Sequence, residues 1–228
     1  MEEFKRNLEE TNVIRSEKSS AMEDKYSQSP DPWKNGERGI YYPMMEKLIS
    51  ELFVDDLVGL TNFLWCDIGC GGGNVGKAIH KACKDRNKSF NMYGIDISHS
   101  AIEYLQQDPE NPYDVLRCLD IETLEDEEAI SIFNKMDVIS MIEMMYYLGE
   151  KKPWKKTIDT LWNALHPRTI VVIADGLISY QYRDYLKNKE DAELIVYYTD
   201  METPVCREIS DNGREWNRYL KVRIYKKL

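Results

Sequence analysis

Three aspartates, Asp67, Asp96 and Asp120, each follow an apolar run in the middle of the chain, where a strand is expected to end. A carboxylate at a strand tip offers two acceptor oxygens and no competing donor, which suits the paired hydroxyls of a ribose. Enzymes that bind dinucleotides use the same device, so Asp96 alone does not separate the classes of nucleotide-dependent enzyme. Three acids after three successive strands nevertheless indicate a ligand that carries a nucleoside.

A glycine-rich loop directly follows the first of these acids. The apolar strand ends on Asp67, and glycines occupy positions 69, 71, 72 and 73 before a helix expected over 74–84. Glycine has no Cβ, so a strand that turns into a helix through glycines brings bare backbone close to a ligand. The identity of that ligand decides the function.

The loop fits two registers. Gly71, Gly73 and Gly76 spell the G-x-G-x-x-G fingerprint of nicotinamide and flavin dinucleotide enzymes. In that register Asp67 and Gly69 would lie inside the strand, where both residues are poor formers. An NAD(P)-dependent oxidoreductase therefore stays as one alternative, and a glycine-rich turn without a ligand is another.

The other register is an apolar strand, Asp67, Gly69, Gly71 and then a helix, and it resembles motif I of the class I S-adenosylmethionine (SAM) methyltransferases. The resemblance implies that Gly69, Cys70 and Gly71 admit the methionine part and the ribose of SAM. It also implies that Asp67 organises the loop and the nearby ammonium group. SAM would be the cofactor and S-adenosylhomocysteine the product. A protein that keeps this fold and binds SAM without turnover is a further alternative.

The resemblance extends to the later strand ends. It implies that Asp96, followed by Ile97, accepts the ribose hydroxyls of SAM. It implies that Asp120 accepts from the exocyclic amine of adenine and that the backbone amide of Ile121 reaches a ring nitrogen. Met141, near the end of the fourth strand, would lie beside the sulfonium.

The segment after the fourth strand resembles the Ser-x-Glu-x-x-Tyr-Tyr-Leu pattern of nodulation-type small-molecule N-methyltransferases. The matching residues are Ser140, Glu143, Tyr146, Tyr147 and Leu148, with one extra residue between the serine and the glutamate. Glu143 and Tyr147 are therefore the candidate catalytic residues. An amine must be neutral to attack, and the Glu143 carboxylate would hold it and accept its proton.

A hydroxyl acceptor would need a stronger base, and the histidines that usually supply one are poorly placed. His80 and His99 lie on expected helices, and His166 precedes the fifth strand at the opposite end of the sheet. The sequence therefore favours methylation of an amine over a hydroxyl, on a small metabolite such as a sugar derivative.

Upstream, Asp31-Pro-Trp33 with Arg38 is similar to the N-terminal segment that covers SAM in the same relatives. This chain has two additional residues before the arginine. The resemblance implies that Arg38 pairs with the carboxylate of the methionine part of SAM, a contact that suits a planar guanidinium.

Strands and helices are expected to alternate from Phe63 onward. This predicts an α/β fold with a Rossmann-like, mostly parallel seven-stranded sheet and helices on both faces. The expected strands are 62–66, 90–96, 113–118, 137–142 and 169–174, and the expected helices are 41–52, 74–84, 98–107, 124–134, 152–165 and 178–188. The runs at 193–199 and 218–226 would close the sheet as an antiparallel pair. Residues 1–60 would form an N-terminal helical lid or cap, and residues 61–228 the methyltransferase domain.

Bulk composition narrows the partners. The 228 residues carry a net charge of −10, and such a charge repels a nucleic-acid polyanion. No apolar stretch approaches the roughly 20 residues of a membrane span, and the charged N-terminus lacks the apolar core of a signal peptide. The five cysteines show no metal-ligand spacing and are expected to be free thiols. We therefore expect a cytoplasmic enzyme with a small-molecule acceptor, no metal and no membrane contact; its oligomeric state is open.

Overall fold

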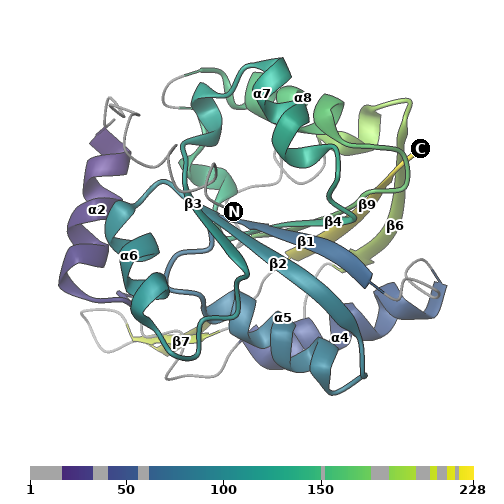
Figure 1. Ribbon diagram of the computed structural model, residues 1–228. Helices are drawn as coiled ribbons and strands as arrows, with labels where there is room; N and C mark the ends of the chain where they lie inside the picture. Colours follow the sequence, from purple (N-terminus) through teal and green to yellow (C-terminus); the bar gives the residue numbers. More distant parts are fainter. Residues whose placement is uncertain are drawn as a thin grey trace.

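A seven-stranded sheet forms the centre of the computed structural model, which describes residues 17–32, 41–55, 62–149, 152–175, 185–198, 206–209, 215–218 and 221–228 (Figure 1). The strand order is β3 (Val115–Cys118), β2 (Ser89–Asp96), β1 (Asn62–Ile68), β4 (Val138–Ile142), β5 (Ile170–Asp175), β9 (Lys221–Lys227) and β6 (Ala192–Tyr198). The first five strands are parallel, and β9 runs antiparallel to both β5 and β6. Because the strand order reverses between β1 and β4, a ligand is expected at the carboxyl ends of these two strands.

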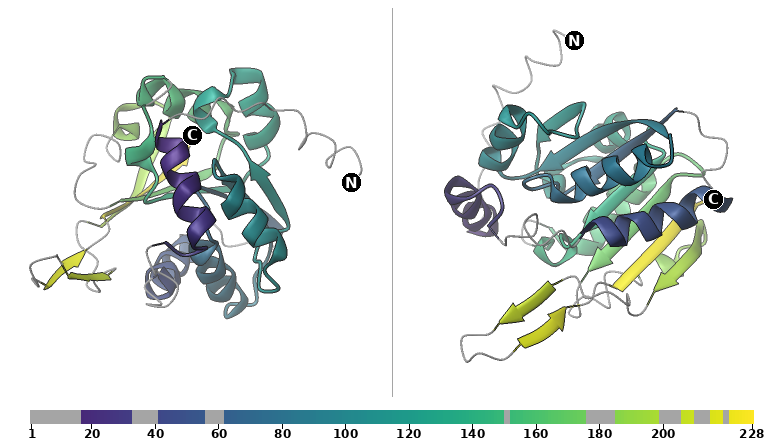
Figure 2. Two further views of the ribbon diagram at one scale, coloured as in Figure 1. Left: turned by 90° about the vertical axis from the view of Figure 1, so that its left-hand side faces the viewer. Right: turned by 90° about the horizontal axis from the view of Figure 1, so that it is seen from below.

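Helices cover both faces of the sheet (Figure 1). On one face lie α4 (Tyr41–Asp55), α5 (Asn74–Lys84) and α6 (His99–Gln107), and on the other lie α7 (Asp126–Phe133) and α8 (Trp154–Ala164). A further helix, α2 (Glu17–Gln28), lies beside α6 (Figure 2). Three residues of α4, namely Met45, Leu48 and Ile49, are part of the buried core. The division of the chain at residue 60 stays a prediction.

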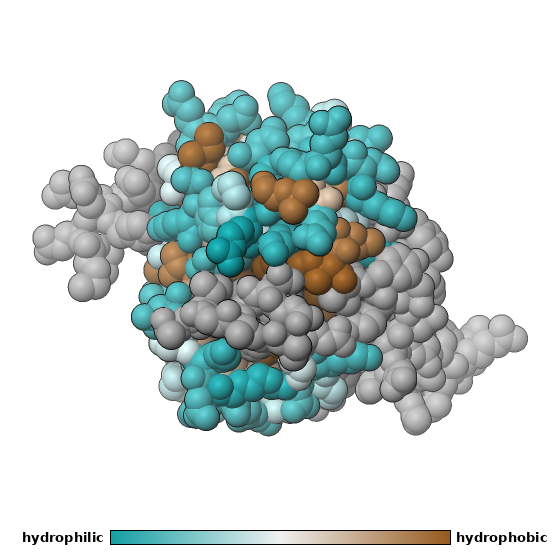
Figure 3. All heavy atoms as spheres, turned by 90° about the vertical axis from the view of Figure 1, so that its right-hand side faces the viewer, coloured by the Kyte–Doolittle hydropathy of each residue, from teal (hydrophilic) through white to brown (hydrophobic). Residues whose placement is uncertain are grey.

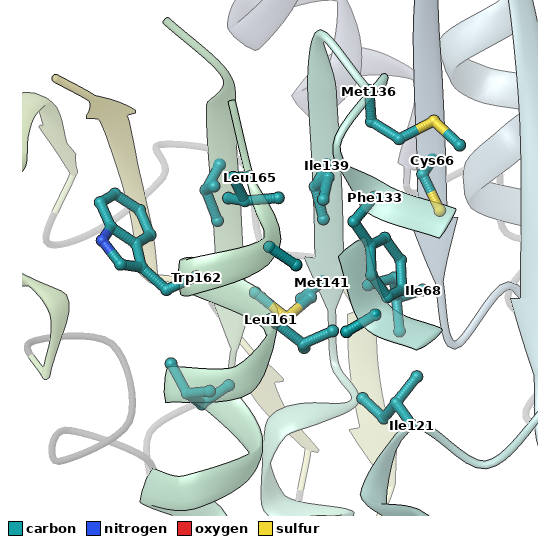
Figure 4. Close-up of a cluster of buried hydrophobic side chains, with 14 of the residues drawn as sticks. Cys66, Ile68, Ile121, Phe133, Met136, Ile139, Met141, Leu161, Trp162 and Leu165 are labelled. Atoms are coloured by element: carbon teal, nitrogen blue, oxygen red, sulfur yellow. The ribbon is translucent and has the colours of Figure 1, made fainter. Parts of the chain in front are cut away.

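Alternation along β1 explains why the core has two layers. Successive side chains of a strand point to opposite faces of the sheet. Phe63 and Trp65 face the layer of α4 and α5, whereas Cys66 and Ile68 face the layer of α7 and α8. Figure 4 shows the second layer, in which Leu161 of α8 meets the side chains that rise from the strands.

The predicted fold class is confirmed. The sheet has seven strands, five of them parallel, and the last strand of the chain is antiparallel to its neighbours. Every expected strand has a counterpart within three residues, and the expected pair at 193–199 and 218–226 corresponds to β6 and β9.

Several predicted boundaries are wrong by two or three residues, and three of them have a clear physical reason. β1 continues to Ile68, so Asp67 lies inside the strand, because the ladders with β2 and β4 both run on to Ile68. β3 begins at Val115 rather than 113, because the Asp114 side chain accepts the Met92 N–H at 2.8 Å where a strand would offer a carbonyl. α7 begins at Asp126 rather than 124, because the short 3-10 helix η1 (Ile121–Thr123) precedes it.

The C-terminal third differs most from the predictions. The expected helix at 178–188 falls largely outside the described residues, and its described end is the short 3-10 helix η3 (Leu186–Asn188). A separate antiparallel pair, β7 (Cys206–Ile209) with β8 (Glu215–Arg218), was not predicted and lies apart from the main sheet (Figure 2).

The coloured part of the surface near the β6 edge is mainly hydrophilic, with hydrophobic residues in separate small patches (Figure 3). None of the described helices combines the length and the apolar character that a membrane crossing requires.

We predict that Leu161→Ala destabilises the fold by about 2–5 kcal/mol, because the residue is 4% exposed and its loss leaves a cavity between α8 and the sheet. Urea unfolding followed by circular dichroism measures the change. The control is Ile130→Ala on α7, where the side chain is 47% exposed and the expected change is within about 0.5 kcal/mol. Equal effects of the two substitutions would contradict the assignment of Leu161 to the core.

Candidate active site

The acidic residues singled out in the sequence meet at one edge of the sheet. Asp67 is the second-last residue of β1, Asp96 is the last residue of β2, and Asp120 follows β3. Glu143 follows β4, the neighbour of β1 on its other side. Parallel strands end at the same edge, so these four carboxylates share the carboxyl edge of the sheet.

Asp67 is held by two side chains. Its carboxylate accepts the Tyr113 hydroxyl and the Ser140 hydroxyl, each at 2.7 Å. Ser140 in turn accepts the indole N–H of Trp65 at 2.9 Å. Asp67 is only 1% exposed, and this burial raises the pKa of its carboxyl group to about 6, although the two hydrogen bonds oppose the rise. Asp67 thus ties β1 to β4 and to the turn before β3.

The glycine loop is shaped by positive backbone φ angles. Gly69, Gly71 and Gly73 have φ values of 77°, 48° and 84°, which lie in the left-handed region that side chains disfavour. The amides of Gly69 and Cys70 both donate to the Ile95 carbonyl, at 2.8 and 3.1 Å. These contacts fasten the loop to the end of β2.

Asp96 joins the glycine loop to the start of α6. Its Oδ2 accepts the Gly71 N–H at 2.8 Å, and its Oδ1 accepts the Ser98 N–H at 2.9 Å. Burial raises the pKa of Asp96, and the backbone N–H donors oppose that rise. The Ser98 hydroxyl accepts the Ala101 N–H at 3.2 Å, so Ser98 is the N-cap of α6.

Asp120 occupies the corresponding place after β3. It is buried, and its Oδ1 accepts the Glu122 N–H at 2.9 Å at the start of η1. Ile121 is buried beside it, whereas Ile97 is half-buried and its carbonyl accepts the Cys118 thiol at 3.5 Å.

Glu143 has an uncommon backbone conformation. Its φ is +55°, which few residues other than glycine and asparagine adopt, and its N–H donates to the Ala174 carbonyl at 2.7 Å. The chain therefore turns at Glu143, whose backbone stays beside the end of β5 and whose side chain is half-buried. Tyr147 is also half-buried and closes the 3-10 helix η2 (Met145–Tyr147).

The side chain of Met141 lies apart from the acids. The Met141 side chain is buried in the hydrophobic layer against α8, where it lies close to Leu161 (Figure 4). The expected lid segment also contains Arg38 and Trp33. Both of these residues lie outside the described residues. The cysteines at 66, 70, 83 and 118 are free thiols, and the described residues contain no cluster of three or more potential metal ligands.

Solved structures share this fold at low sequence identity. The N-methyltransferase NodS from Bradyrhizobium japonicum, in complex with S-adenosyl-L-homocysteine (SAH), has a TM-score of 0.60 and 16% identity, over 92% of this chain and 97% of that one. The plantazolicin methyltransferase BpumL, with a monoazolic desmethylPZN analogue and SAH, has a TM-score of 0.60 and 17% identity, over 99% and 100%. A TehB-like SAM-dependent methyltransferase from Corynebacterium glutamicum has a TM-score of 0.56 and 20% identity, over 92% and 100%.

Residues 66–171 match the protein family described as a methyltransferase domain, and this span contains the glycine loop and all four carboxylates. This match, which spans just under half of the chain, and the shared fold support a class I SAM-dependent methyltransferase. No curated protein matches this chain in sequence. The family match favours a methyltransferase over an NAD(P)-dependent oxidoreductase. The expectation that Asp67 would not lie inside the first strand was wrong, because β1 runs through Asp67.

Three residues of the methyltransferase that contact this edge were not predicted. Tyr113 holds Asp67, Glu23 of α2 binds the first turn of α6, and the Tyr26 hydroxyl lies against Gly71. The turn before β3 and the polar helix α2 carry no sequence motif, so nothing in the sequence indicated these contacts.

We predict that Asp67 lowers the stability of the ligand-free methyltransferase increasingly as the pH rises from about 4 to about 6. Its pKa is about 6 in the folded state against 3.8 as the ordinary value, so the folded protein binds the extra proton within this window. Relative to the wild type, Asp67→Asn should therefore gain on the order of 3 kcal/mol between pH 4 and pH 7. Urea unfolding of both proteins across this range measures the gain, and a difference that does not vary with pH would refute it.

Proposed function

We propose that this methyltransferase transfers the methyl group of SAM to the nitrogen of a small-molecule amine, with Glu143 as the residue that holds the acceptor. The observation that carries the proposal is the position of Glu143 at the carboxyl edge, in a left-handed turn fastened to Ala174. A half-buried carboxylate at this point is suited to bind an ammonium group and to take up the proton that must leave before attack.

The residues at the carboxyl edge fit SAM. Each oxygen of Asp96 accepts one backbone N–H, and a carboxylate has about four acceptor positions, so capacity remains for the two ribose hydroxyls. Asp120, after β3, is the proposed partner of the adenine amine, together with the amide of Ile121. The glycine loop from Gly69 to Gly71 is proposed to admit the methionine part and the ribose.

The charge of this edge also fits the cofactor. Asp67, Asp96 and Asp120 bring three carboxylates to neighbouring strand ends, and all three are buried. SAM, when bound, supplies a methyl group on a positively charged sulfur, which negative surroundings favour. We propose that Arg38 pairs with the methionine carboxylate and that residues 1–60 include the lid that covers this site.

The catalytic contribution of the chain is proposed to be mainly positional. Methyl transfer requires the acceptor, the methyl carbon and the sulfur to lie in line, and holding them so removes an entropic barrier. Glu143 would fix the amine on the side of β4 and β5, with Tyr147 at the border of the same space. The Met141 side chain is occupied by packing, so we propose that only its backbone lies beside the sulfonium.

Nitrogen is favoured over oxygen because no histidine is available as a strong base. His80 and His99 are exposed on helices, and His166 is near Asp137 at the amino end of the strands. The names of solved structures with this fold agree with this choice. NodS is an N-methyltransferase, and the coclaurine N-methyltransferase, with 12% identity and a TM-score of 0.52, was solved with N-methylheliamine and SAH.

We predict that Asp96→Ala abolishes detectable binding of SAH in calorimetry, because the ribose hydroxyls lose their acceptor. The fold should be retained, as judged by far-ultraviolet circular dichroism. The matched control is Asp114→Ala, since Asp114 also accepts a backbone N–H of β2 but is exposed and precedes β3. Wild-type affinity in the Asp96 variant would rule out its assignment to the ribose.

We predict that Glu143→Gln lowers kcat by about 10²–10⁴-fold while the affinity for SAM changes little, because the amide keeps the shape but cannot take the proton. The acceptor is first found by incubating the protein with isotopically labelled SAM and a metabolite extract of its host, and identifying the labelled product by mass spectrometry. Glu125→Gln, an exposed glutamate before α7, is the control. Full activity of Glu143→Gln, or label on an oxygen, would overturn the proposal.

A further inference from the structure

The side chain of Glu23 attaches the helix α2 to the start of α6. Glu23 accepts the Ser98 hydroxyl at 2.8 Å and the Ser100 hydroxyl at 2.6 Å, and both its oxygens accept the Ser100 N–H at 3.3 Å. The first turn of a helix has unsatisfied N–H groups and a positive dipole end, so a carboxylate binds well there. Glu23 thus bridges two elements that lie more than 70 residues apart in the sequence, at separations of 75 and 77 residues.

The start of α6, which Glu23 binds, follows directly after Asp96 at the end of β2. Ser98 donates its own N–H to Asp96, and Asp96 accepts the N–H of Gly71. A continuous series of hydrogen bonds therefore runs from α2 through the start of α6 to the glycine loop. Besides burial, which is the larger cause, the nearby Glu23 carboxylate contributes to the raised pKa of Asp96.

One turn further along α2, the chain lies directly on the glycine loop. The Tyr26 hydroxyl occupies the space where a Cβ of Gly71 would be, and the Pro30 carbonyl occupies the corresponding space at Gly72. Tyr26 also lies close enough to Asp96 and Tyr147 for their charges to raise its pKa, after burial as the main cause. Residues three or four apart share one face of a helix, so Glu23 and Tyr26 act from the same face of α2.

Apolar packing contributes little to this attachment. Between residues 20 and 32 no side chain is fully buried, and most of those on α2 are exposed or half-buried. A helix of 12 residues is marginal in water without tertiary contacts. The charge-assisted hydrogen bonds of Glu23 are therefore the strongest described contact that keeps α2 in place.

We propose that Glu23 is a positioning residue that fastens α2 over the glycine loop and thereby sets how fast the cofactor enters and leaves. This inference rests on the proposed cofactor site at the carboxyl edge. With Glu23 in place, Tyr26 and Pro30 cover Gly71 and Gly72. When its hydrogen bonds break, α2 swings away and the loop becomes accessible.

The test compares Glu23→Ala with Asp24→Ala, a substitution of the next acidic residue on α2, which is exposed. In the ligand-free protein, hydrogen exchange of residues 17–28 should rise about tenfold in Glu23→Ala, because the charged hydrogen bonds that protect the helix are lost. The dissociation rate of SAH, measured by surface plasmon resonance, should rise by about the same factor. Asp24→Ala should change neither quantity.

Two further variants test whether the effect comes from the hydrogen bonds of Glu23 or from a general loss of structure. Glu23→Gln keeps the shape and one acceptor oxygen, so it should lie between the wild type and Glu23→Ala in both measurements. Ser100→Ala removes one of the two hydroxyls that Glu23 binds, and the double variant with Glu23→Ala should be no faster than Glu23→Ala alone. Additive effects would overturn the proposal, and so would exchange and dissociation rates equal to those of Asp24→Ala.

The same measurements show which proposal is wrong if one of them fails, the role of Glu23 or the cofactor site. If SAH did not bind the wild type, or bound Asp96→Ala with wild-type affinity, the proposed cofactor site would be wrong. The proposed effect of Glu23 on the binding and release of the cofactor would then be wrong as well. If SAH bound as proposed while α2 exchanged equally in all variants, the site would stand and Glu23 would have no positioning role.

Discussion

The buried Asp67 carboxylate is the interaction on which the carboxyl edge depends. A charged group inside a sheet lowers stability, and the raised pKa of Asp67 expresses that cost. It is accommodated because Tyr113 and Ser140 each donate a hydroxyl to it. Those two contacts join β1 to β4 on one side and to the turn before β3 on the other. The glycine loop that leaves β1 immediately afterwards therefore starts from a fixed point.

Asp96 connects the glycine loop to the start of α6. It binds the middle of the glycine loop and the start of α6, and the start of α6 is where Glu23 attaches α2. Strand end, glycine loop and N-terminal helix are thus connected in series by carboxylates that accept from N–H and O–H donors. The missing side chains of Gly71 and Gly72 make room for the Tyr26 hydroxyl and the Pro30 carbonyl.

Much of the fold could be predicted because parallel strands, buried on both faces, stand out as apolar runs ended by glycine or acid. The expected strand ends placed Asp96 and Asp120 correctly at the carboxyl edge of the sheet. The predicted strand stopped at residue 66 with Asp67 at its edge, because propensity argues against an aspartate in a strand, but the ladders with two neighbouring strands carry β1 on to Ile68. The contacts of Glu23 and Tyr113 could not be predicted, since polar pairing between distant segments leaves no periodic signal.

The Tyr113 ring that holds Asp67 has a consequence for its surroundings. A Cβ at Gly76 would collide with the end of this ring, and a Cβ at Gly94 would press on its side. The third glycine of the apparent dinucleotide fingerprint is therefore required by a phenol and not by a pyrophosphate. The last glycine of such a series can thus be required by the bulk of an aromatic neighbour, and among homologous chains the residue at position 76 should enlarge only where the one at 113 shrinks.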